Sequence, residues 1–304
     1  MNKNINLAVI LILVVGIGLG VVIGVAAGNF LFNLKYPEAT ASVPLGDENG
    51  TTESTSDSQA SNQTTSSADK PVDETPKKMI ALTFDDGPNK TNTNAILDLL
   101  EQYNAKATFF VCGSNLTSGT SATLKRTITL GCEIGNHTYS HKDMKTLSEQ
   151  DLLAEIQNTN EKIAQYSGTD YKCTLYRPPY GNINLSAMDK LYNNGIRMYS
   201  IHWSSDSLDW DYQNQYKKGQ ISREEAIQST FDTIVRETKE GTVILMHDIH
   251  EITPDVLKLV LEKYTAEGYT FVTVSELFGF TENADKEAYY NRYRSTDSIL
   301  PTTK

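Results

Sequence analysis

Two adjacent carboxylates and a closely spaced pair of histidines are the residues best suited to chemistry in this sequence. Asp85 and Asp86 follow directly after the apolar run 80–84. His137 and His141 stand four residues apart, a spacing that places both rings on one side of a helical turn. Two imidazoles and one carboxylate supply three ligands and leave positions open for water or substrate, which is the pattern of a catalytic Zn²⁺ site. Each motif by itself also fits a polar turn or a pair of surface histidines.

The two carboxylates are expected to have different roles, because neighbouring residues in an extended segment point to opposite sides. One should bind the metal, and the other should stay free as a general base beside a water whose pKa the metal lowers to about 7. Arg177 follows a later apolar run, where its charge could orient the catalytic carboxylate. Pro179 stiffens the next loop, which could aim the Tyr180 backbone N–H at a developing oxyanion.

Two further segments at strand ends add acid chemistry and sugar binding. His247 follows the apolar run 243–246 and is a candidate proton donor. Trp203 and Trp210 flank a pair of carboxylates, Asp206 and Asp209. Because the flat faces of indoles stack on the apolar faces of sugars, this segment indicates a sugar site, although tryptophans at such positions also serve as core residues.

Apolar runs alternate with helical patterns from residue 79 onward. The predicted strands cover residues 79–83, 107–111, 133–136, 174–177, 197–200, 242–246 and 270–273. The predicted helices cover residues 92–103, 147–166, 226–238 and 253–264, with cap residues Ser148, Ser222 and Thr253. This alternation predicts a parallel sheet with helices outside, either as an open doubly wound sheet or as a reduced α/β barrel. In both folds functional groups gather at the carboxyl ends of the strands.

Five motifs in this order resemble those of the polysaccharide deacetylases, carbohydrate esterase family 4, whose shared domain is the NodB homology domain. The motifs are Thr83-Phe84-Asp85-Asp86-Gly87-Pro88, His137-x-x-x-His141, Arg177-Pro178-Pro179-Tyr180, Asp206-x-x-Asp209-Trp210 and Leu245-x-His247. The resemblance covers residues 79–280 and is greatest to the peptidoglycan N-acetylglucosamine deacetylases. It implies a distorted (β/α)7 barrel, and it therefore favours the barrel over the open sheet.

The resemblance also implies a role for each matching residue. These are the general base Asp85, the metal ligands Asp86, His137 and His141, the arginine Arg177 that tunes the base, the oxyanion donor Tyr180, the general acid His247 and its partner Asp209. The substrate pocket is implied to include Tyr180, Trp210, Leu245 and Pro179. The cofactor is implied to be a divalent metal, Zn²⁺ or alternatively Co²⁺.

The expected activity is hydrolysis of carbon–nitrogen bonds other than peptide bonds, in linear amides. The expected substrate is the N-acetyl group of a cell-surface polysaccharide, above all the N-acetylglucosamine residues of peptidoglycan. The alternatives are a deacetylase of chitin oligomers, an O-acetyl esterase on xylan and a catalytically silent glycan-binding ectodomain.

The amino-terminal quarter has the composition of an anchor and a tether. Residues 7–27 form an almost unbroken apolar run, about the length that crosses a bilayer, which favours a membrane anchor (1–35) over a cleaved signal peptide. Residues 36–78 are rich in serine and threonine and predict a disordered linker. The catalytic domain (79–280) is then expected outside the cell, held by a single-pass anchor or secreted if the segment is cleaved. No function is assigned to the tail (281–304).

The charge and the cysteine count exclude two classes of protein. The 304-residue chain has 38 acidic and 27 basic residues, a net charge of -11, which disfavours binding to nucleic acid. Three cysteines are too few for a disulfide-built scaffold. A Cys132–Cys173 bridge is the easiest pairing to form between parallel strands, whereas free buried thiols are the simpler expectation. We expect a monomer.

Overall fold

One parallel sheet runs through the part of the chain that the computed structural model describes, residues 78–280. Its strands are β1 (Lys78–Asp85), β2 (Thr108–Val111), β3 (Glu133–Asn136), β4 (Leu175–Tyr176), β5 (Tyr199–Ser200), β6 (Ser205–Asp206), β7 (Val243–His247) and β8 (Tyr269–Val272). The order across the sheet is β5-β4-β3-β2-β1-β7-β6, and β8 pairs with the first half of β1. This is an α/β half-barrel of parallel strands, consistent with the distorted barrel that the family resemblance implies.

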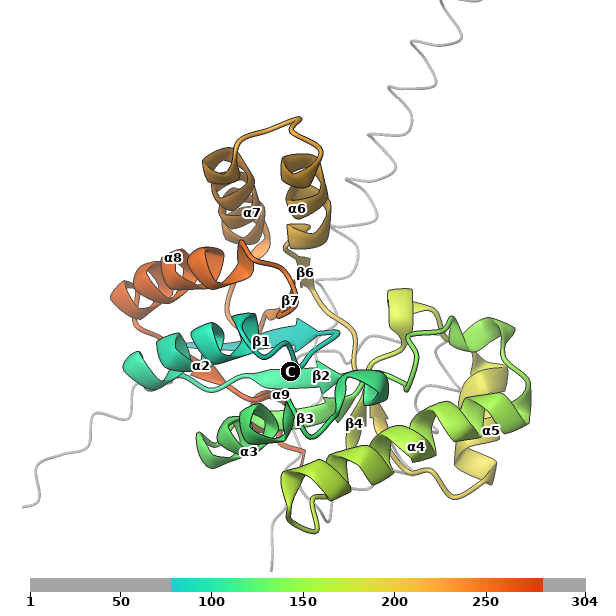
Figure 1. Ribbon diagram of the computed structural model, residues 1–304. Helices are drawn as coiled ribbons and strands as arrows, with labels where there is room; N and C mark the ends of the chain where they lie inside the picture. The colour runs from blue at the N-terminus through green and yellow to red at the C-terminus, as the bar shows by residue number, and fades with distance from the viewer. Residues whose placement is uncertain (1–77, 281–304) are drawn as a thin grey trace, which may run out of the picture. The chain divides into compact units, whose positions relative to one another are not determined.

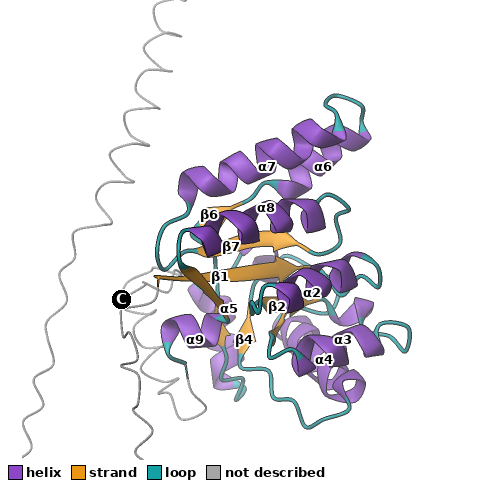
Figure 2. Cartoon of the chain, turned by 90° about the vertical axis from the view of Figure 1, so that its left-hand side faces the viewer, coloured by secondary structure: helices purple, strands orange, loops and turns teal. Residues whose placement is uncertain are grey.

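The helices lie on the outside of this sheet (Figures 1 and 2). They are α2 (Asn92–Gln102), α3 (Ser121–Thr129), α4 (Glu149–Ser167), α5 (Leu185–Asn193), α6 (Asp209–Lys217), α7 (Arg223–Glu237), α8 (Thr253–Ala266) and α9 (Val274–Phe278). Short 3-10 turns occur at Gly113–Asn115, Met144–Thr146 and Pro179–Gly181. Figure 1 shows α6 and α7 packed side by side next to β6 and β7.

Strand β1 is buried on both faces, as expected for a central strand of a parallel sheet. Ile80, Leu82 and Phe84 pack into the main core together with residues of α2 and α8. Ala81 points the other way, into a separate cluster inside the half-barrel. Because side chains alternate along a strand, Asp85 shares the inner face with Ala81. The alternation in β1 therefore directs this carboxylate into the half-barrel.

The helix caps mostly agree with the sequence patterns. Ser148 caps α4, and Ser222 forms a capping box with Glu225 at the start of α7, as predicted. The predicted cap at Thr253 is wrong, because Thr253 is already the first residue of α8. Its hydroxyl donates a hydrogen bond to Asp209 and does not cap the helix. A distant carboxylate thus determines what this side chain does.

All seven predicted strands are present, with ends shifted by up to two residues. The patterns did not predict β6, α3, α5, α6 or α9. The strand β6 has two residues, too few for any periodicity, and α6 has the largely polar sequence DWDYQNQYK. Elements of this kind are stabilised by what they pack against, and local sequence carries little signal for them.

Several predictions lie outside the described residues. The anchor (1–35), the linker up to residue 77 and the tail (281–304) are among them. Lys78, the last residue of the predicted linker, already belongs to β1. No helix within residues 78–280 has both the length and the apolar character needed to cross a bilayer.

The three cysteines are free thiols, which confirms the simpler expectation and excludes a Cys132–Cys173 bridge. Burial raises the pKa of the Cys132 thiol to about 11 and that of Cys173 to about 12. Both therefore stay protonated and act as small apolar side chains in the fold.

Candidate active site

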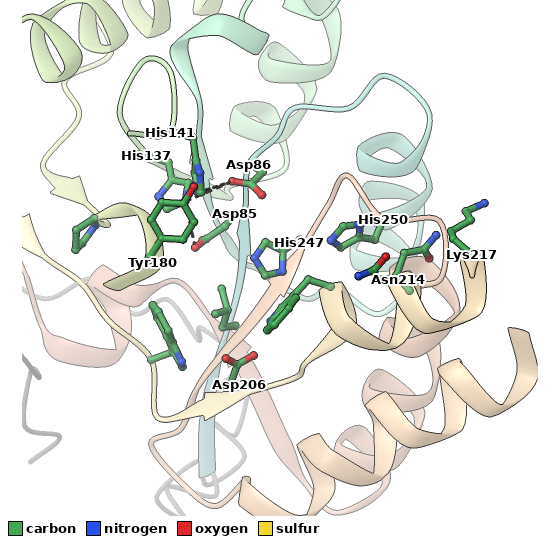
Figure 3. A pocket seen from close by; sticks show the side chains of 15 residues that line it. Asp85, Asp86, His137, His141, Tyr180, Asp206, Asn214, Lys217, His247 and His250 are labelled. Atoms are coloured by element: carbon green, nitrogen blue, oxygen red, sulfur yellow. Dashed lines mark ion pairs between the residues drawn. The ribbon is translucent and has the colours of Figure 1, made fainter. Parts of the chain in front are cut away.

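The carboxyl ends of the strands open into one pocket of about 810 Å³. Asp85 at the end of β1 is the register partner of His247 at the end of β7, so the predicted base and acid lie on adjacent strands. Figure 3 shows the pocket from close by. It is lined by Asp85, Asp86, His137, His141, Pro178, Tyr180, Trp203, Asp206, Trp210, Gln213, Asn214, Lys217, Leu245, His247 and His250.

The structure brings the three predicted metal ligands together. Asp86 Oδ1 lies 3.5 Å from His137 Nε2 and 3.3 Å from His141 Nε2. One ligand atom from each residue lies within 4.8 Å of the other two. The Asp85 carboxylate is adjacent, with Oδ2 3.6 Å from His137 Nε2. Of the two neighbouring carboxylates, Asp86 thus joins the histidines and Asp85 lies beside them.

The donor set fits a divalent metal ion. His137 Nδ1 lies 2.8 Å from the Arg177 carbonyl oxygen, which can only accept, so Nδ1 carries the hydrogen and Nε2 faces Asp86 with a lone pair. Burial lowers the pKa of His137 to about 3, which keeps the ring neutral. A neutral imidazole oriented by a backbone carbonyl, next to a second imidazole and a carboxylate, is a typical zinc ligand set.

Helix α4 holds the loop between the two histidines. The Glu155 carboxylate accepts hydrogen bonds from the backbone N–H groups of Tyr139 and Ser140, both at 2.7 Å, and from the Ser140 hydroxyl at 2.5 Å. Asn136 Oδ1 accepts a further bond from the Thr138 N–H at 2.8 Å. Thr138 has a positive φ of 64°, a conformation that costs free energy without such support. The sequence analysis missed Glu155, although a carboxylate on the buried face of a helix is a usable signal.

Asp85 is paired with a fully buried arginine. Arg177 Nη1 donates to Asp85 Oδ1 at 2.7 Å and to Thr83 Oγ1 at 2.9 Å. The remaining guanidinium nitrogens donate to the backbone oxygens of Ile201 and His202. Burial raises the pKa of the Asp85 carboxyl, and the Arg177 charge opposes that rise. Through these hydrogen bonds the arginine links β1 to the segment between β5 and β6. The strands β5 and β6 are the first and last in the order across the sheet.

His247 is held by Asp209, the predicted partner. His247 Nδ1 lies 2.7 Å from Asp209 Oδ1, while Oδ2 accepts from the His247 backbone N–H at 2.7 Å and from the Thr253 hydroxyl at 2.9 Å. Burial disfavours the charged imidazole, but the Asp209 carboxylate outweighs it and raises the pKa of His247 to about 9. His247 is therefore protonated at neutral pH, with Nε2 left to act as a proton donor.

Three of the four residues predicted to bind the substrate line the pocket. Leu245, Tyr180 and Trp210 line the pocket, and the last two are 66% and 48% exposed. Pro179 is buried and is absent from the lining, where its neighbour Pro178 stands instead. Both prolines are buried, and the sequence pattern gave no means of choosing which of the two lines the pocket. Trp203 and Asp206, from the segment interpreted as a sugar site, also line the pocket. The lining residues that had no predicted role are Gln213, Asn214, Lys217 and His250.

The comparison with known proteins agrees with this geometry. Residues 72–199 match the sequence model of the family described as polysaccharide deacetylase. The chain is 39% identical over 201 residues to the peptidoglycan-N-acetylmuramic acid deacetylase PdaC of Bacillus subtilis, covering 66% of this chain and 39% of PdaC. It is 32% identical over 207 residues to a peptidoglycan-N-acetylglucosamine deacetylase of Bacillus cereus, covering 67% of this chain and 90% of that protein.

A solved structure of the same family is also similar to this chain. The family 4 acetyl xylan esterase of Clostridium thermocellum, determined in complex with a cobalt ion, is similar with a TM-score of 0.57 and 32% identity. The match covers 66% of this chain and 91% of that chain. By contrast, the chain matches less than half of the length of PdaC, namely 39% of it.

Proposed function

Because the chain belongs to the polysaccharide deacetylase family, whose members are hydrolases, we propose that it removes N-acetyl groups from the N-acetylglucosamine residues of peptidoglycan. The observation that carries the proposal is the meeting of Asp86, His137 and His141 beside Asp85 and His247 in one pocket. The names of the PdaC and Bacillus cereus relatives support peptidoglycan as the substrate. The products would be acetate and a free amino sugar.

We propose that Asp86, His137 and His141 hold a divalent metal ion, Zn²⁺ in the cell, for which Co²⁺ can substitute. When bound, such an ion lowers the pKa of water and polarises a carbonyl oxygen. The cobalt complex of the Clostridium thermocellum esterase supports Co²⁺ as a metal that such a site can bind. The neutral ring of His137 and the close approach of Asp86 support the choice of ligands.

Asp85 is the proposed general base that takes a proton from the attacking water. Arg177 favours the ionised form of this carboxylate and fixes its position through the 2.7 Å pair. Burial of the carboxylate raises its proton affinity, so it is a better base than an exposed aspartate. The pKa of the Asp85 carboxyl therefore lies above its ordinary value, which favours transfer of a proton from water, and the Arg177 charge limits that rise.

His247 is the proposed general acid. Its Nδ1 is held by Asp209, so its Nε2 proton is the one available to the departing amine. Protonation of the amine is needed because an unprotonated amine is a very poor leaving group. The Tyr180 backbone N–H is the proposed donor to the oxyanion that forms when water adds to the amide carbon. Trp210 and Leu245 are proposed to enclose the acetyl methyl group.

Acetate release tests the proposal. The wild-type enzyme with Zn²⁺ or Co²⁺ should release acetate from peptidoglycan at a higher kcat/KM than from chitin oligomers or acetylated xylan. A preference for xylan would favour the esterase alternative, which the similarity to an acetyl xylan esterase makes specific. Glycan binding without any acetate release after metal addition would refute the enzymatic assignment in favour of a silent binding domain.

We further propose that residues 1–35 anchor a monomeric enzyme in the cell membrane with its catalytic domain outside. The apolar run 7–27 supports an anchor. Fractionation of cells that express the full chain tests this, since the protein should sediment with membranes and be accessible to an external protease. Recovery of the protein from the medium with residues 1–35 missing would indicate secretion after cleavage.

A further inference from the structure

The pocket extends beyond the catalytic groups along one face of α6. Trp210, Gln213, Asn214 and Lys217 all line it, and their spacing of three or four residues places them on the same side of the helix. Figure 3 shows Asn214 and Lys217 beyond His250, on the side of His247 away from His137 and His141. A glycan strand bound at the reaction centre would continue over this face.

Lys217 is the only lysine or arginine among the residues that line the pocket. The carboxylates at the reaction centre already have partners, since Asp85 pairs with Arg177 and Asp209 pairs with His247. The chain as a whole has a net charge of -11, which repels an anionic polymer. Within this lining, the Lys217 ammonium is therefore the lysine or arginine charge that can attract an anionic substituent of the substrate.

The present partner of Lys217 leaves its charge open to a ligand. Its Nζ lies 2.7 Å from Glu251 Oε2, and the two side chains are 54% and 41% exposed. Ion pairs this exposed contribute little to stability, so an incoming carboxylate can share or replace Glu251. Trp210, one turn from Asn214 and two turns from Lys217, exposes nearly half of its surface for stacking against a sugar.

We propose that Trp210, Asn214 and Lys217 form a subsite for a neighbouring sugar that carries a carboxylate. The indole, which also borders the proposed acetyl pocket, would stack on the neighbouring sugar with its exposed surface. The Asn214 amide would hydrogen-bond to polar substituents of that sugar, and the ammonium of Lys217 would bind its carboxylate. The enzyme would then prefer glycan strands with acidic substituents to neutral N-acetylglucosamine oligomers. This inference rests on the proposed function, because it names the part of the substrate that lies next to the reacting sugar.

The test compares Lys217→Met with Lys218→Met in the full-length, metal-loaded enzyme. Lys218 is the next residue, is exposed and is absent from the pocket lining, so it is a matched control for charge. The substrates are a neutral chitin tetramer, a peptidoglycan tetrasaccharide with its lactyl carboxylates but no peptide, and the same tetrasaccharide with its stem peptides. Acetate release gives kcat and KM for each.

Lys217→Met should raise KM about fivefold for an acidic tetrasaccharide that Lys217 binds, which is the size expected for one partly exposed ion pair. The KM for the chitin tetramer should stay unchanged. Lys217→Glu should have a larger effect in the same direction, and added salt should reduce the difference between the wild-type enzyme and both variants. Lys218→Met should match the wild type. An effect confined to the peptide-free tetrasaccharide identifies the lactyl carboxylate as the ligand, because the stem peptide is joined to that carboxyl group as an amide. An effect confined to the peptide-bearing tetrasaccharide identifies a carboxylate of the stem peptide, and an effect with both shows that Lys217 binds a carboxylate from either source.

Equal losses on neutral and acidic substrates, or no loss on the acidic ones, would overturn the subsite. Thermal unfolding of each variant separates a folding defect from a binding defect, because Lys217 lies at the exposed end of α6 and its removal should leave Tm unchanged. If the wild-type enzyme releases no acetate from any of the three substrates, the proposed function itself fails. If the wild-type enzyme releases acetate and the Lys217 variants behave like it, only the subsite fails.

Discussion

Replacement of Asp209 by asparagine should move the alkaline limb of the pH–rate profile. The carboxylate is fully buried, lies 2.7 Å from His247 Nδ1 and is what keeps the pKa of His247 near 9 despite burial. The acid must be protonated to act, so wild-type activity should persist through neutral pH and fall as the pH rises through about 9. Without the charge of Asp209, burial lowers the pKa of His247 and only the smaller attractions of Asp85 and Asp86 oppose it, so the limb should move down toward pH 6.5.

The size of the effect follows from the two pKa values. At pH 8 a group with a pKa of about 9 is mostly protonated, whereas a group with a pKa of 6.5 is protonated in only about 3% of molecules. The Asp209→Asn variant should therefore lose about 30-fold in kcat at pH 8 and progressively less as the pH falls. The assay is acetate release between pH 5 and pH 10 (roughly the span of the His247 shift) at saturating substrate and metal.

Thr253→Val is the matched control, because it removes one hydrogen bond to Asp209 Oδ2 and leaves the charge. Its alkaline limb should stay close to that of the wild type. An asparagine also places an amide hydrogen near two donors, the His247 N–H and the Thr253 hydroxyl, so thermal unfolding must show that the variant is folded. A folded Asp209→Asn enzyme whose limb remains near pH 9 would refute the assignment of His247 as the acid.

Three other substitutions test the rest of the site. Asp85→Asn should lower kcat by about 10²–10⁴-fold while Co²⁺ still binds, and retention of a tenth of the activity would contradict its role as the base. Glu155→Gln should weaken Co²⁺ binding about tenfold, measured from the cobalt absorption spectrum, whereas Glu161→Gln on the exposed side of the same helix should not. Gly87→Ala should destabilise the fold by about 1–3 kcal/mol in urea unfolding, because its Cβ would lie 2.2 Å from the Asp248 carboxylate oxygens. Equal stability of this variant and the wild type would mean that the Asp248 side chain moves freely.

Much of the catalytic chemistry could be predicted because it depends on short stretches of sequence. The pair Asp85 and Asp86 follows an apolar strand, and His137 and His141 have a spacing that fits one metal ion. Parallel strands place their carboxyl ends at one edge, so residues distant along the chain were expected to meet there. The register of Asp85 with His247 agrees with that expectation.

Other parts of the site depend on which elements pack against each other. Glu155 supports the histidine loop only because α4 lies beside it, and Thr253 serves Asp209 only because α8 begins next to β7. Helix α6 lines the pocket with Lys217 among other residues. Nothing in the polar sequence of α6 distinguishes this helix from a solvent-exposed one.

The amino-acid sequence by itself determined the types of chemical group, the strands that carry them and two of the helix caps. The tertiary structure decided which proline lines the pocket and which side chains support the loop between the two histidines. The physical reason is that strand and cap preferences act between residues near each other in sequence. Hydrogen bonds, burial and charge pairing at the site act through space, between residues as distant in sequence as Asp85 and Arg177, which are 92 positions apart.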